Sequence, residues 1–596
     1  DKRIKMILKH FPLNIISIVL LLILSGTGES SASPKENNNH YRKSGKIIPE
    51  QSGDWTDQLL SSLTLREKIA QMIVTHSEGF SLDENSAEFQ RLKNLIVNEK
   101  VGGIIFFRGN SYQEASLINK LQSLSGTPLL ISADFERGTR MRLDDGSLFP
   151  SNMALGATRN PQLAYLMGLQ IAKECKALGI HQNYAPVVDV NNNSKNPIIN
   201  VRSYGEDPEL VSSMADQFIK GTQDGNVIAT VKHFPGHGDT DIDSHSDLPV
   251  LGFSKSRLEN LELVPFKNAI RNDVMSVMIA HLSLPALDNE SNVPASLSKN
   301  IIEGVLIDEM KFKGLIVTDA LNMAGVVKHF STENVALRCI NAGVDLILMP
   351  QGEEITISAI EQAVLKGTIT EERINASVRK ILDAKKWLKL DEKKLTDLNS
   401  IADIVNSDEA KRISQQIADE SITLVKNNEN ILPFKSPSNQ SCMIVSMNNG
   451  NEKANSDYFL TRFSEKNKFD RTSFYDLTGE VSNSDEIINN AEMYDVVIIP
   501  IYAKVKIKTG TVGLPETQIS LVNSLVSKGK KVIVISFGNP YLIQGFSGID
   551  SYICAYADAE TSINSVIDSF YGTINFKGKL PVTISDEFRF GDGLIK

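Results

Sequence analysis

The sequence predicts an α/β protein with an N-terminal (β/α)8 TIM-type barrel followed by a C-terminal α/β three-layer sandwich. The chain has 596 residues, which is long enough to bury at least two cores. Between residues 54 and 390, short apolar runs alternate with helix-length amphipathic segments, a pattern typical of a parallel sheet. A second, shorter alternation occupies residues 411–596 after a polar linker at 391–410. It predicts a separate sheet covered by helices.

The elements of the barrel follow from local patterns. Thr64 and Glu67 form a capping box, which predicts a helix over the apolar run Ile69–Val74. Helices are also expected over Gln113–Leu124, Pro208–Gln223 and Ser256–Arg271. The eighth strand is expected either near Lys68–Thr75 or in a variant opening of the barrel. The seven clearer strands are Val101–Phe107, Pro128–Ala133, His181–Asp189, Val227–Lys232, Val274–Ile279, Gly314–Thr318 and Val344–Met349.

The second domain is predicted from four apolar strands with helices between them. Helices are expected over Glu516–Ser527 and Ser562–Phe570. The strands are Cys442–Ser446, Val496–Ile501, Val532–Ser536 and Tyr552–Ala555. The domain is expected to pack structurally, to form a homodimer or to contact a longer glycan, and the sequence leaves these three roles open.

Composition and charge argue against a nucleic-acid partner and against a disulfide-rich protein. The hydrophobic fraction is 41% and the charged fraction 22%, as in ordinary globular proteins. A formal net charge of -10 without a basic stripe argues against a nucleic-acid partner. The four cysteines are far apart, which argues against a disulfide framework, and three of them lie in apolar stretches and are expected to be buried thiols.

The N-terminal segment has the order of a secretory signal peptide over residues 1–33. A basic stretch (2–9) precedes an apolar run (Leu13–Leu24), which small residues follow. The run is shorter than the roughly 20 residues of a membrane-spanning helix, which favours cleavage over a membrane anchor. Residues 34–53 are polar and predict a flexible spacer. We therefore expect an exported protein, periplasmic or extracellular, with no stable membrane span after cleavage.

The densest group of chemically active side chains is the run KHFPGHGDTDIDSH, residues 232–245. It begins where a predicted strand ends, and its Pro and Gly residues prevent regular structure, so it is expected to be a loop at the strand's carboxyl end. In (β/α)8 barrels that end carries the active site. Asp243 and His245 would point the same way on extended backbone, so the carboxylate could orient an imidazole that exchanges protons with substrate. The alternative is a solvated loop with an incidental histidine.

A second signal is Asp319, which ends the apolar strand Gly314–Thr318 abruptly. An aspartate at this position can attack an anomeric carbon and form a glycosyl-enzyme intermediate, although many barrels hold a structural aspartate there. Other polar side chains are expected to bind sugar hydroxyls in a common pocket, with surface salt bridges as the alternative. They are Asp134, Arg142, Arg202, Lys232 and His233.

Four motifs together resemble family 3 glycoside hydrolases, and most closely the bacterial β-N-acetylglucosaminidase (β-hexosaminidase) branch. They are KHFPGHGDT, the D-x-H pair that follows it, T-D-A-L after the Gly314–Thr318 strand, and R-S-Y after Y-A-P-V-x-D-V. The resemblance covers about residues 54–390, and the second domain resembles the C-terminal sandwich of many members. It implies a barrel enzyme that releases terminal β-linked N-acetylhexosamine with retention of configuration, without a metal or organic cofactor.

The resemblance also implies residue roles. Asp319 matches the nucleophile, His245 the acid/base and Asp243 the residue that orients His245. The five polar residues Asp134, Arg142, Arg202, Lys232 and His233 match positions that hold the sugar. One motif departs from the family: D-x-E-G-G-R is replaced by a segment in which Arg137 stands for a glycine and Thr139 for an arginine. This change affects the local backbone and the outer subsites.

Other functions remain open at this level. A family 3 β-glucosidase or β-xylosidase would take its acid/base from the second domain. A β-N-acetylglucosaminide phosphorylase is conceivable, because a neutral imidazole tolerates an anionic acceptor such as phosphate. A metal-dependent hydrolase would use His233 and His237, although Pro235 and Gly236 break the helix between them. A silent sugar-binding protein is the last alternative. The expected substrate is a small glycoside or oligosaccharide derived from cell wall, chitin or host glycans.

Overall fold

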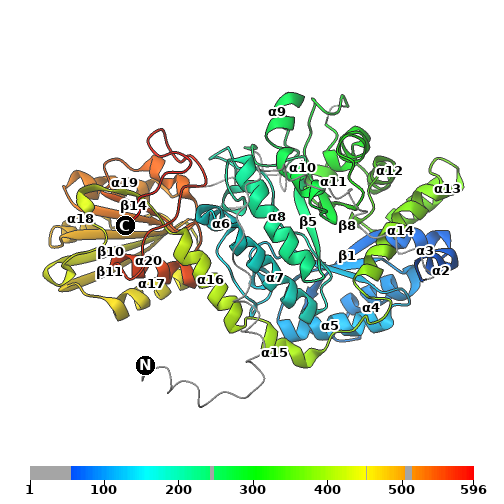
Figure 1. Ribbon diagram of the computed structural model, residues 1–596, viewed down its shortest axis with the longest axis horizontal. Coiled ribbons are helices and arrows are strands. Elements are labelled where there is room, and N and C mark those ends of the chain that lie inside the picture. The colour runs from blue at the N-terminus through cyan, green and yellow to red at the C-terminus, as the bar shows by residue number, and fades with distance from the viewer. Residues whose placement is uncertain (1–54, 242–246, 291, 451–452, 504–512) are drawn as a thin grey trace, which may run out of the picture. The chain divides into compact units, whose positions relative to one another are not determined.

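The computed structural model describes residues 55–241, 247–290, 292–450, 453–503 and 513–596 (Figure 1). The predicted signal peptide and spacer lie outside the described residues, and so do Asp243 and His245. In the described part of the chain, none of the helices is both long and apolar enough to span a lipid bilayer. The domain boundaries 1–33, 34–53, 54–390, 391–410 and 411–596 stay predictions.

The first sheet is the predicted (β/α)8 barrel. Within the described residues it holds eight strands in the order β7-β6-β5-β4-β3-β2-β1-β8, and all the pairings are parallel. A parallel bridge between Val317 and Leu346 joins the two ends of this order and closes the barrel. The strands are β1 (Ile73–Gly79), β2 (Gly103–Gly109), β3 (Leu130–Ala133), β4 (Gln182–Asn183), β5 (Ile228–Phe234), β6 (Ser276–Ile279), β7 (Leu315–Thr318) and β8 (Ile347–Leu348).

The predicted barrel strands are confirmed, with differences in extent. Strand β8 covers only Ile347–Leu348 of the predicted Val344–Met349. The predicted capping box of Thr64 and Glu67 is present, but its helix α3 (Leu65–Gln71) ends earlier than expected, and Ile73 and Val74 belong to β1. Strand β4 is much shorter than the apolar run that predicted it. Pro186 follows it and has no N–H to donate to a neighbouring strand.

Helices follow the barrel strands, and two of them approach closely. Helices α7 (Pro161–Leu178) and α8 (Pro208–Asp224) lie side by side (Figure 1). A Cβ at Gly168 would lie 2.4 Å from the Phe218 carbonyl oxygen, so only glycine allows this approach. The other helices are α2 (Trp55–Ser62), α4 (Ala87–Asn94), α5 (Ser111–Leu124), α6 (Asn152–Thr158), α9 (Lys255–Asn260), α10 (Val264–Arg271), α11 (Ala324–Val327), α12 (Thr332–Ala342), α13 (Glu353–Leu365), α14 (Glu371–Trp387), α15 (Ile401–Ile404) and α16 (Asp408–Ser421).

The single helix predicted over Ser256–Arg271 is wrong, because the structure has two helices there, α9 and α10. Pro265 lies in the first turn of α10, where a missing N–H is tolerated, and it favours a new helix start over continuation of the old one. Short segments of other helix types complete the described chain. They are the 3-10 turns η2 (Thr139–Met141), η3 (Asn200–Arg202), η4 (Ala295–Leu297), η6 (Leu398–Ser400), η7 (Asn428–Asn430), η8 (Pro437–Asn439) and η9 (Pro540–Gly545), and the π-helical segments η1 (Leu95–Glu99) and η5 (Asn300–Glu309).

The second sheet confirms the predicted α/β sandwich and adds two strands that were not predicted. In the described residues its order is β11-β10-β12-β13-β14-β9, and only β9 is antiparallel to its neighbour. Both missed strands lie at the edges, and β11 is largely exposed, so it lacks an apolar run. The strands are β9 (Thr423–Asn427), β10 (Ser441–Asn448), β11 (Arg471–Thr478), β12 (Val496–Tyr502), β13 (Lys531–Ser536) and β14 (Ser551–Cys554).

Alternation along the strands gives the second domain a core on each face of its sheet. Met443 and Val445 of β10 belong to the core that contains helices α18 (Ser484–Ala491) and α19 (Glu516–Ser527). Cys442 and Ile444 belong to the opposite core, with α17 (Lys453–Lys466) and α20 (Glu560–Phe570) (Figure 1). All four cysteines are buried and free, so the burial predicted for three of them holds for the fourth as well.

Helix α6 joins the barrel to the second domain. Its Met153, Ala154 and Ala157 are part of the core beneath α18 and α19. Ser151, which caps α6, donates a hydrogen bond from Oγ to the Tyr556 carbonyl oxygen at 2.9 Å. The second domain is therefore anchored next to the loops at the carboxyl end of the barrel strands.

A buried carboxyl group in α5 leads to a prediction about pH. Both side-chain oxygens of Glu114 lack a hydrogen-bond partner among the described residues, and burial raises the pKa of Glu114 to about 8, with the nearby Asp145 and Glu78 adding to the effect. In the unfolded chain the pKa of a glutamate is about 4.3. Between this pH and the folded-state pKa, the folded protein keeps the Glu114 proton and the unfolded chain loses it, so the free energy of unfolding falls as pH rises. The slope is about 1.4 kcal/mol per pH unit.

We therefore expect Glu114→Gln to have nearly the wild-type unfolding free energy at pH 4.5 and to be more stable than wild type by a few kcal/mol at pH 8. Denaturant unfolding of both proteins at the two pH values measures this difference, in which other titrating groups cancel. A constant difference across this pH range would contradict a protonated Glu114.

Candidate active site

A cavity of about 580 Å³ lies at the carboxyl ends of the barrel strands. The predicted residues Asp134, Arg142, Arg202, Lys232, His233 and Asp319 all line it. The second domain contributes part of its wall through Phe537, Asn539, Tyr556 and Asp558. A pocket of this size suits a ligand larger than a few atoms.

Lys232, near the end of β5, is held between two carboxylates. Its Nζ lies 2.7 Å from Oδ1 of Asp134 and 2.8 Å from Oε1 of Glu136, and only 3% of its side chain is exposed. Burial alone would lower the pKa of the ammonium group, but the attraction of the two carboxylates outweighs it and raises the pKa. Lys232 therefore stays charged on the cavity floor.

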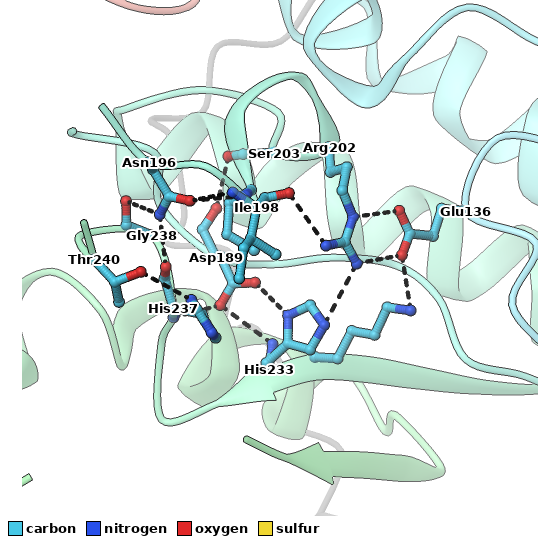
Figure 2. A network of polar contacts seen from close by, with 12 residues as sticks. Glu136, Asp189, Asn196, Ile198, Arg202, Ser203, His233, His237, Gly238 and Thr240 are labelled. Carbon is cyan, nitrogen blue, oxygen red and sulfur yellow. Dashed lines mark hydrogen bonds and ion pairs between the residues drawn. The ribbon is translucent and has the colours of Figure 1, made fainter. Parts of the chain in front are cut away.

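Glu136 also binds Arg202, which lies in η3 after β4. Arg202 donates from Nη2 to Oε1 at 2.6 Å and from Nε to Oε2 at 2.9 Å, a two-pronged contact (Figure 2). Burial would raise the pKa of Glu136, but Arg202 and Lys232 outweigh it and hold the pKa well below its usual range. Arg142 donates to Oδ2 of Asp134 at 3.2 Å, so the two carboxylates and the three cationic side chains linked to them form one network.

Asp189 orients His233, near the end of β5, and His237, in the loop that follows. Figure 2 shows the His233 imidazole between the Asp189 carboxylate and the Arg202 guanidinium. The His233 Nδ1 lies 2.7 Å from Asp189 Oδ2, and the backbone N–H of His237 donates to Oδ1 at 2.7 Å. Because Nδ1 faces the carboxylate, the other ring nitrogen, Nε2, faces the cavity. It lies 3.5 Å from Arg202 Nη2.

Burial and these contacts determine the protonation states of Asp189 and His237. Burial would raise the pKa of Asp189, but attraction to His233 and the hydrogen bonds from His233 and from the His237 backbone N–H outweigh it and lower the pKa. Burial, together with the neighbouring His233, lowers the pKa of His237 to about 4. His237 is therefore neutral near pH 7.

Asn196 fixes the turn that carries Arg202 against the loop after β5. Its Nδ2 donates to the carbonyl oxygens of His237 and Gly238, each at 2.9 Å (Figure 2). Its Oδ1 accepts from the backbone N–H groups of Ile198 at 2.9 Å and of Ile199 at 2.8 Å. A Cβ at Gly238 would lie 1.8 Å from the Val190 carbonyl oxygen, so only glycine fits this crossing.

Asp319 follows β7 directly and is half-buried in the cavity wall. Its N–H donates to the Ile279 carbonyl oxygen at 2.9 Å, and its Oδ1 accepts from the N–H of Ala320 at 2.7 Å. Strand β7 is four positions from β3 in the closed barrel order, so Asp319 and Asp134 come from opposite sides of the barrel. A ligand between them would meet a carboxylate at each end.

The unusual segment after Asp134 has two structural consequences. Arg137 lines the cavity with its Nη1 3.7 Å from Oδ1 of Asp558, and it thereby connects the barrel to the second domain. Thr139 is buried and donates from Oγ1 to Glu174 Oε2 at 2.5 Å, and Ser147 binds the other oxygen of Glu174. The buried carboxylate of Glu174 thus holds this loop where the family has an arginine.

Several residues of this network were not identified from the sequence. Glu136, Asp189 and Asn196 position the predicted groups, and Asp558 comes from a domain for which the sequence assigned no site residue. Asp189 stands inside Y-A-P-V-x-D-V, one of the motifs that carried the resemblance, and Glu136 stands inside the segment that departs from D-x-E-G-G-R, so their places in these motifs were the available signal. Among the described residues, no three His, Cys, Asp or Glu side chains are grouped as a metal site would require, and the rings of His233 and His237 are 5.8 Å apart.

Comparison with known proteins agrees with this architecture. Residues 64–384 match the model of the glycosyl hydrolase family 3 N-terminal domain, and residues 422–589 match that of the C-terminal domain. Beta-hexosaminidase A of Pseudoalteromonas piscicida is 34% identical over 376 residues, which are 58% of this chain and 62% of that relative. The chain thus spans about three fifths of that relative's length.

Two solved structures match over both domains. A family 3 β-N-acetylglucosaminidase from Paenibacillus sp. str. FPU-7 is 31% identical with a TM-score of 0.77, covering 88% of this chain and 99% of its own. The β-glucoside phosphorylase BglX is 26% identical with a TM-score of 0.80, covering 89% of this chain and 96% of its own. Since one family model alone matches more than half of the residues, the chain belongs to glycosyl hydrolase family 3 and is a glycoside hydrolase.

Proposed function

We propose that this glycoside hydrolase is a retaining exo-β-N-acetylglucosaminidase that releases terminal β-linked N-acetylhexosamine. The observation that carries the proposal is the position of Asp319 in the cavity wall, across the barrel from Asp134, which is paired with Lys232. Similarity to a β-hexosaminidase and to a β-N-acetylglucosaminidase supports the choice of sugar.

The reaction we propose has two displacements at the anomeric carbon. The Asp319 carboxylate attacks that carbon, the bond to the leaving-group oxygen breaks, and His245 gives this oxygen its proton. His245 then takes a proton from water, and the resulting hydroxide displaces Asp319 from the glycosyl-enzyme intermediate. Asp243 orients His245 throughout. Two inversions give overall retention.

The charged network would bind the sugar. Its carboxylates accept hydrogen bonds and its cations donate them, and the ion pairs among these groups hold each side chain in place before the substrate enters. The acceptors are Asp134 and Glu136, and the donors are Lys232, Arg142 and Arg202. The imidazole of His233 adds its Nε2. Groups that are already ordered lose little conformational entropy when they bind, which favours both affinity and alignment.

The decisive experiment compares 4-nitrophenyl N-acetyl-β-D-glucosaminide with the matching glucoside and follows the product anomer by NMR. We expect the N-acetylated substrate to be preferred and the β-anomer of the sugar to appear first. A preference for the glucoside, or the α-anomer as first product, would refute the proposed function.

Phosphorolysis is a second candidate because Arg137, Arg142 and Arg202 line the cavity and a structural relative is a β-glucoside phosphorylase. The same assay with inorganic phosphate distinguishes the two reactions. Hydrolysis gives the free sugar at every phosphate concentration, whereas a phosphorylase gives the sugar 1-phosphate and a rate that rises with phosphate.

His245→Gln is expected to lower kcat/KM by about 10²- to 10⁴-fold on a disaccharide, because the sugar alkoxide must be protonated as it leaves. The loss should be smaller on the 4-nitrophenyl glycoside, whose leaving group needs little protonation. Measurements on both substrates give the ratio, with exposed His76→Gln as the matched control. Equal losses on both substrates would contradict the acid/base role.

We also propose that the enzyme is exported, to the periplasm or the cell exterior, on the strength of the sequence of residues 1–33. Cell-wall fragments are then the substrate to test first. Product analysis on purified muropeptides and on chitobiose, side by side, measures which glycan is preferred. Retention of the tagged protein in the cytoplasm would contradict export. The homodimer stays a prediction.

A further inference from the structure

Two asparagines in the cavity wall have buried polar atoms without a hydrogen-bond partner among the described residues. Asn200 is 1% exposed, and both its Nδ2 and its Oδ1 are unpaired. Asn152 is 2% exposed; its Nδ2 donates to the Arg202 carbonyl oxygen at 2.7 Å, but its Oδ1 is unpaired. Buried side-chain polar atoms in proteins nearly always have a partner. Since both residues line the cavity, a ligand can supply the missing partners.

The backbone holds both side chains in place. Asn200 has φ 40°, a left-handed conformation that a non-glycine residue rarely adopts. Its turn is tied down by Asn196 and by the hydrogen bond from the Arg202 N–H to the Ile199 carbonyl oxygen at 2.8 Å. Asn152 is the first residue of α6, whose cap Ser151 binds the second domain. Such fixed positions are what recognition of a specific group requires.

The barrel order places these amides far from Asp319. Asn200 follows β4 in the chain. Strand β4 lies between β3, which ends just before Asp134, and β5, which carries Lys232. Strand β7, which ends before Asp319, is three positions from β4 and four from β3. A sugar whose anomeric carbon meets Asp319 would therefore turn its opposite end, with the hydroxyls at C3 and C4, towards the Asn200 side.

We propose that Asn200 and Asn152 are specificity-determining residues that bind the hydroxyl groups at the end of the sugar farthest from the anomeric carbon; this inference rests on the proposed function. An amide offers a donor and an acceptor side by side, and a hydroxyl both donates and accepts, so Asn200 complements two neighbouring hydroxyls. The Oδ1 of Asn152 adds an acceptor. A substrate without these hydroxyls leaves buried amide atoms unpaired and is rejected.

The test measures whether removing an enzyme side chain and removing a substrate hydroxyl have additive effects on kcat/KM. Wild type and Asn200→Gly are assayed on 4-nitrophenyl N-acetyl-β-D-glucosaminide and on its 3-deoxy and 4-deoxy analogues. Glycine suits the left-handed backbone, so this substitution removes the side chain with its amide without straining the turn, and folding is kept. For wild type we expect kcat/KM to fall about 10- to 100-fold when the bound hydroxyl is removed. For Asn200→Gly the parent substrate should show a similar loss, and the deoxy analogue little further loss.

Two controls keep the result interpretable. Asn226→Gly replaces another asparagine with positive φ (60°), at the opposite end of β5, and should behave as wild type on every substrate. Asn152→Ala is a second variant and should reduce the same deoxy penalty. An unchanged 3-deoxy and 4-deoxy penalty in Asn200→Gly would overturn the inference, as would coupling confined to the 2-acetamido group. If wild type hydrolyses only the glucoside, the proposed function fails, and the deoxy comparison in the glucoside series still tests Asn200.

Discussion

Asp319→Asn is expected to lower kcat/KM by about 10⁴-fold or more while changing substrate binding little. The amide is isosteric with the carboxylate, but it is neutral and a poor nucleophile, so the first displacement fails. The backbone contacts of Asp319 with Ile279 and Ala320 involve main-chain groups and one side-chain oxygen, which asparagine preserves. Steady-state kinetics on the 4-nitrophenyl substrate measures the loss.

The nucleophilic role can be tested further with azide. Asp319→Ala leaves space for a small anion, and azide should restore turnover and give the α-glycosyl azide, because only one inversion then takes place. Asp224→Asn, at an exposed carboxylate paired with Lys220, is the matched control and should keep wild-type activity. An Asp319→Asn enzyme with more than a tenth of the wild-type rate would remove Asp319 as the nucleophile.

The second large effect is expected at Glu136. Glu136→Gln keeps the shape of the side chain but removes the negative charge between Lys232 and Arg202. Breaking a buried ion pair in this way typically lowers the free energy of unfolding by about 3–5 kcal/mol. Activity should fall as well, since Lys232 and Arg202 line the cavity and lose a shared partner.

The effect should depend on pH with a defined sign. The pKa of Glu136 is depressed in the folded protein, so its stabilising contribution is present above the unfolded value of about 4.3 and is lost as pH falls through the folded value. Calorimetric unfolding of both proteins at neutral and acidic pH measures the difference. Glu309→Gln removes an exposed partner of Lys255 and should change stability by less than about 1 kcal/mol. Equal small effects for both variants would show that the Glu136 network contributes little.

Much of the fold follows from local sequence patterns. Buried parallel strands are continuous apolar runs, so the barrel strands and the central strands of the second sheet were visible. The edge strand β11 was missed because it is largely exposed and has no apolar run, and β9 was missed because its buried part is only the short Thr423–Val425 segment. The break between α9 and α10 was missed because the amphipathic pattern continues across it, although Pro265 marked the place.

For the site, the sequence determined which groups could do the chemistry: the carboxylate that ends β7 and the charged residues at the ends of β3 and β5. Their positions depend only on where strands end, and strand ends are local features. Only the tertiary structure decided the partners. Glu136 with Arg202, Asp189 with His233, and Arg137 with Asp558 are each brought together from distant parts of the chain. Such pairings arise from barrel closure and domain packing, which no local pattern encodes.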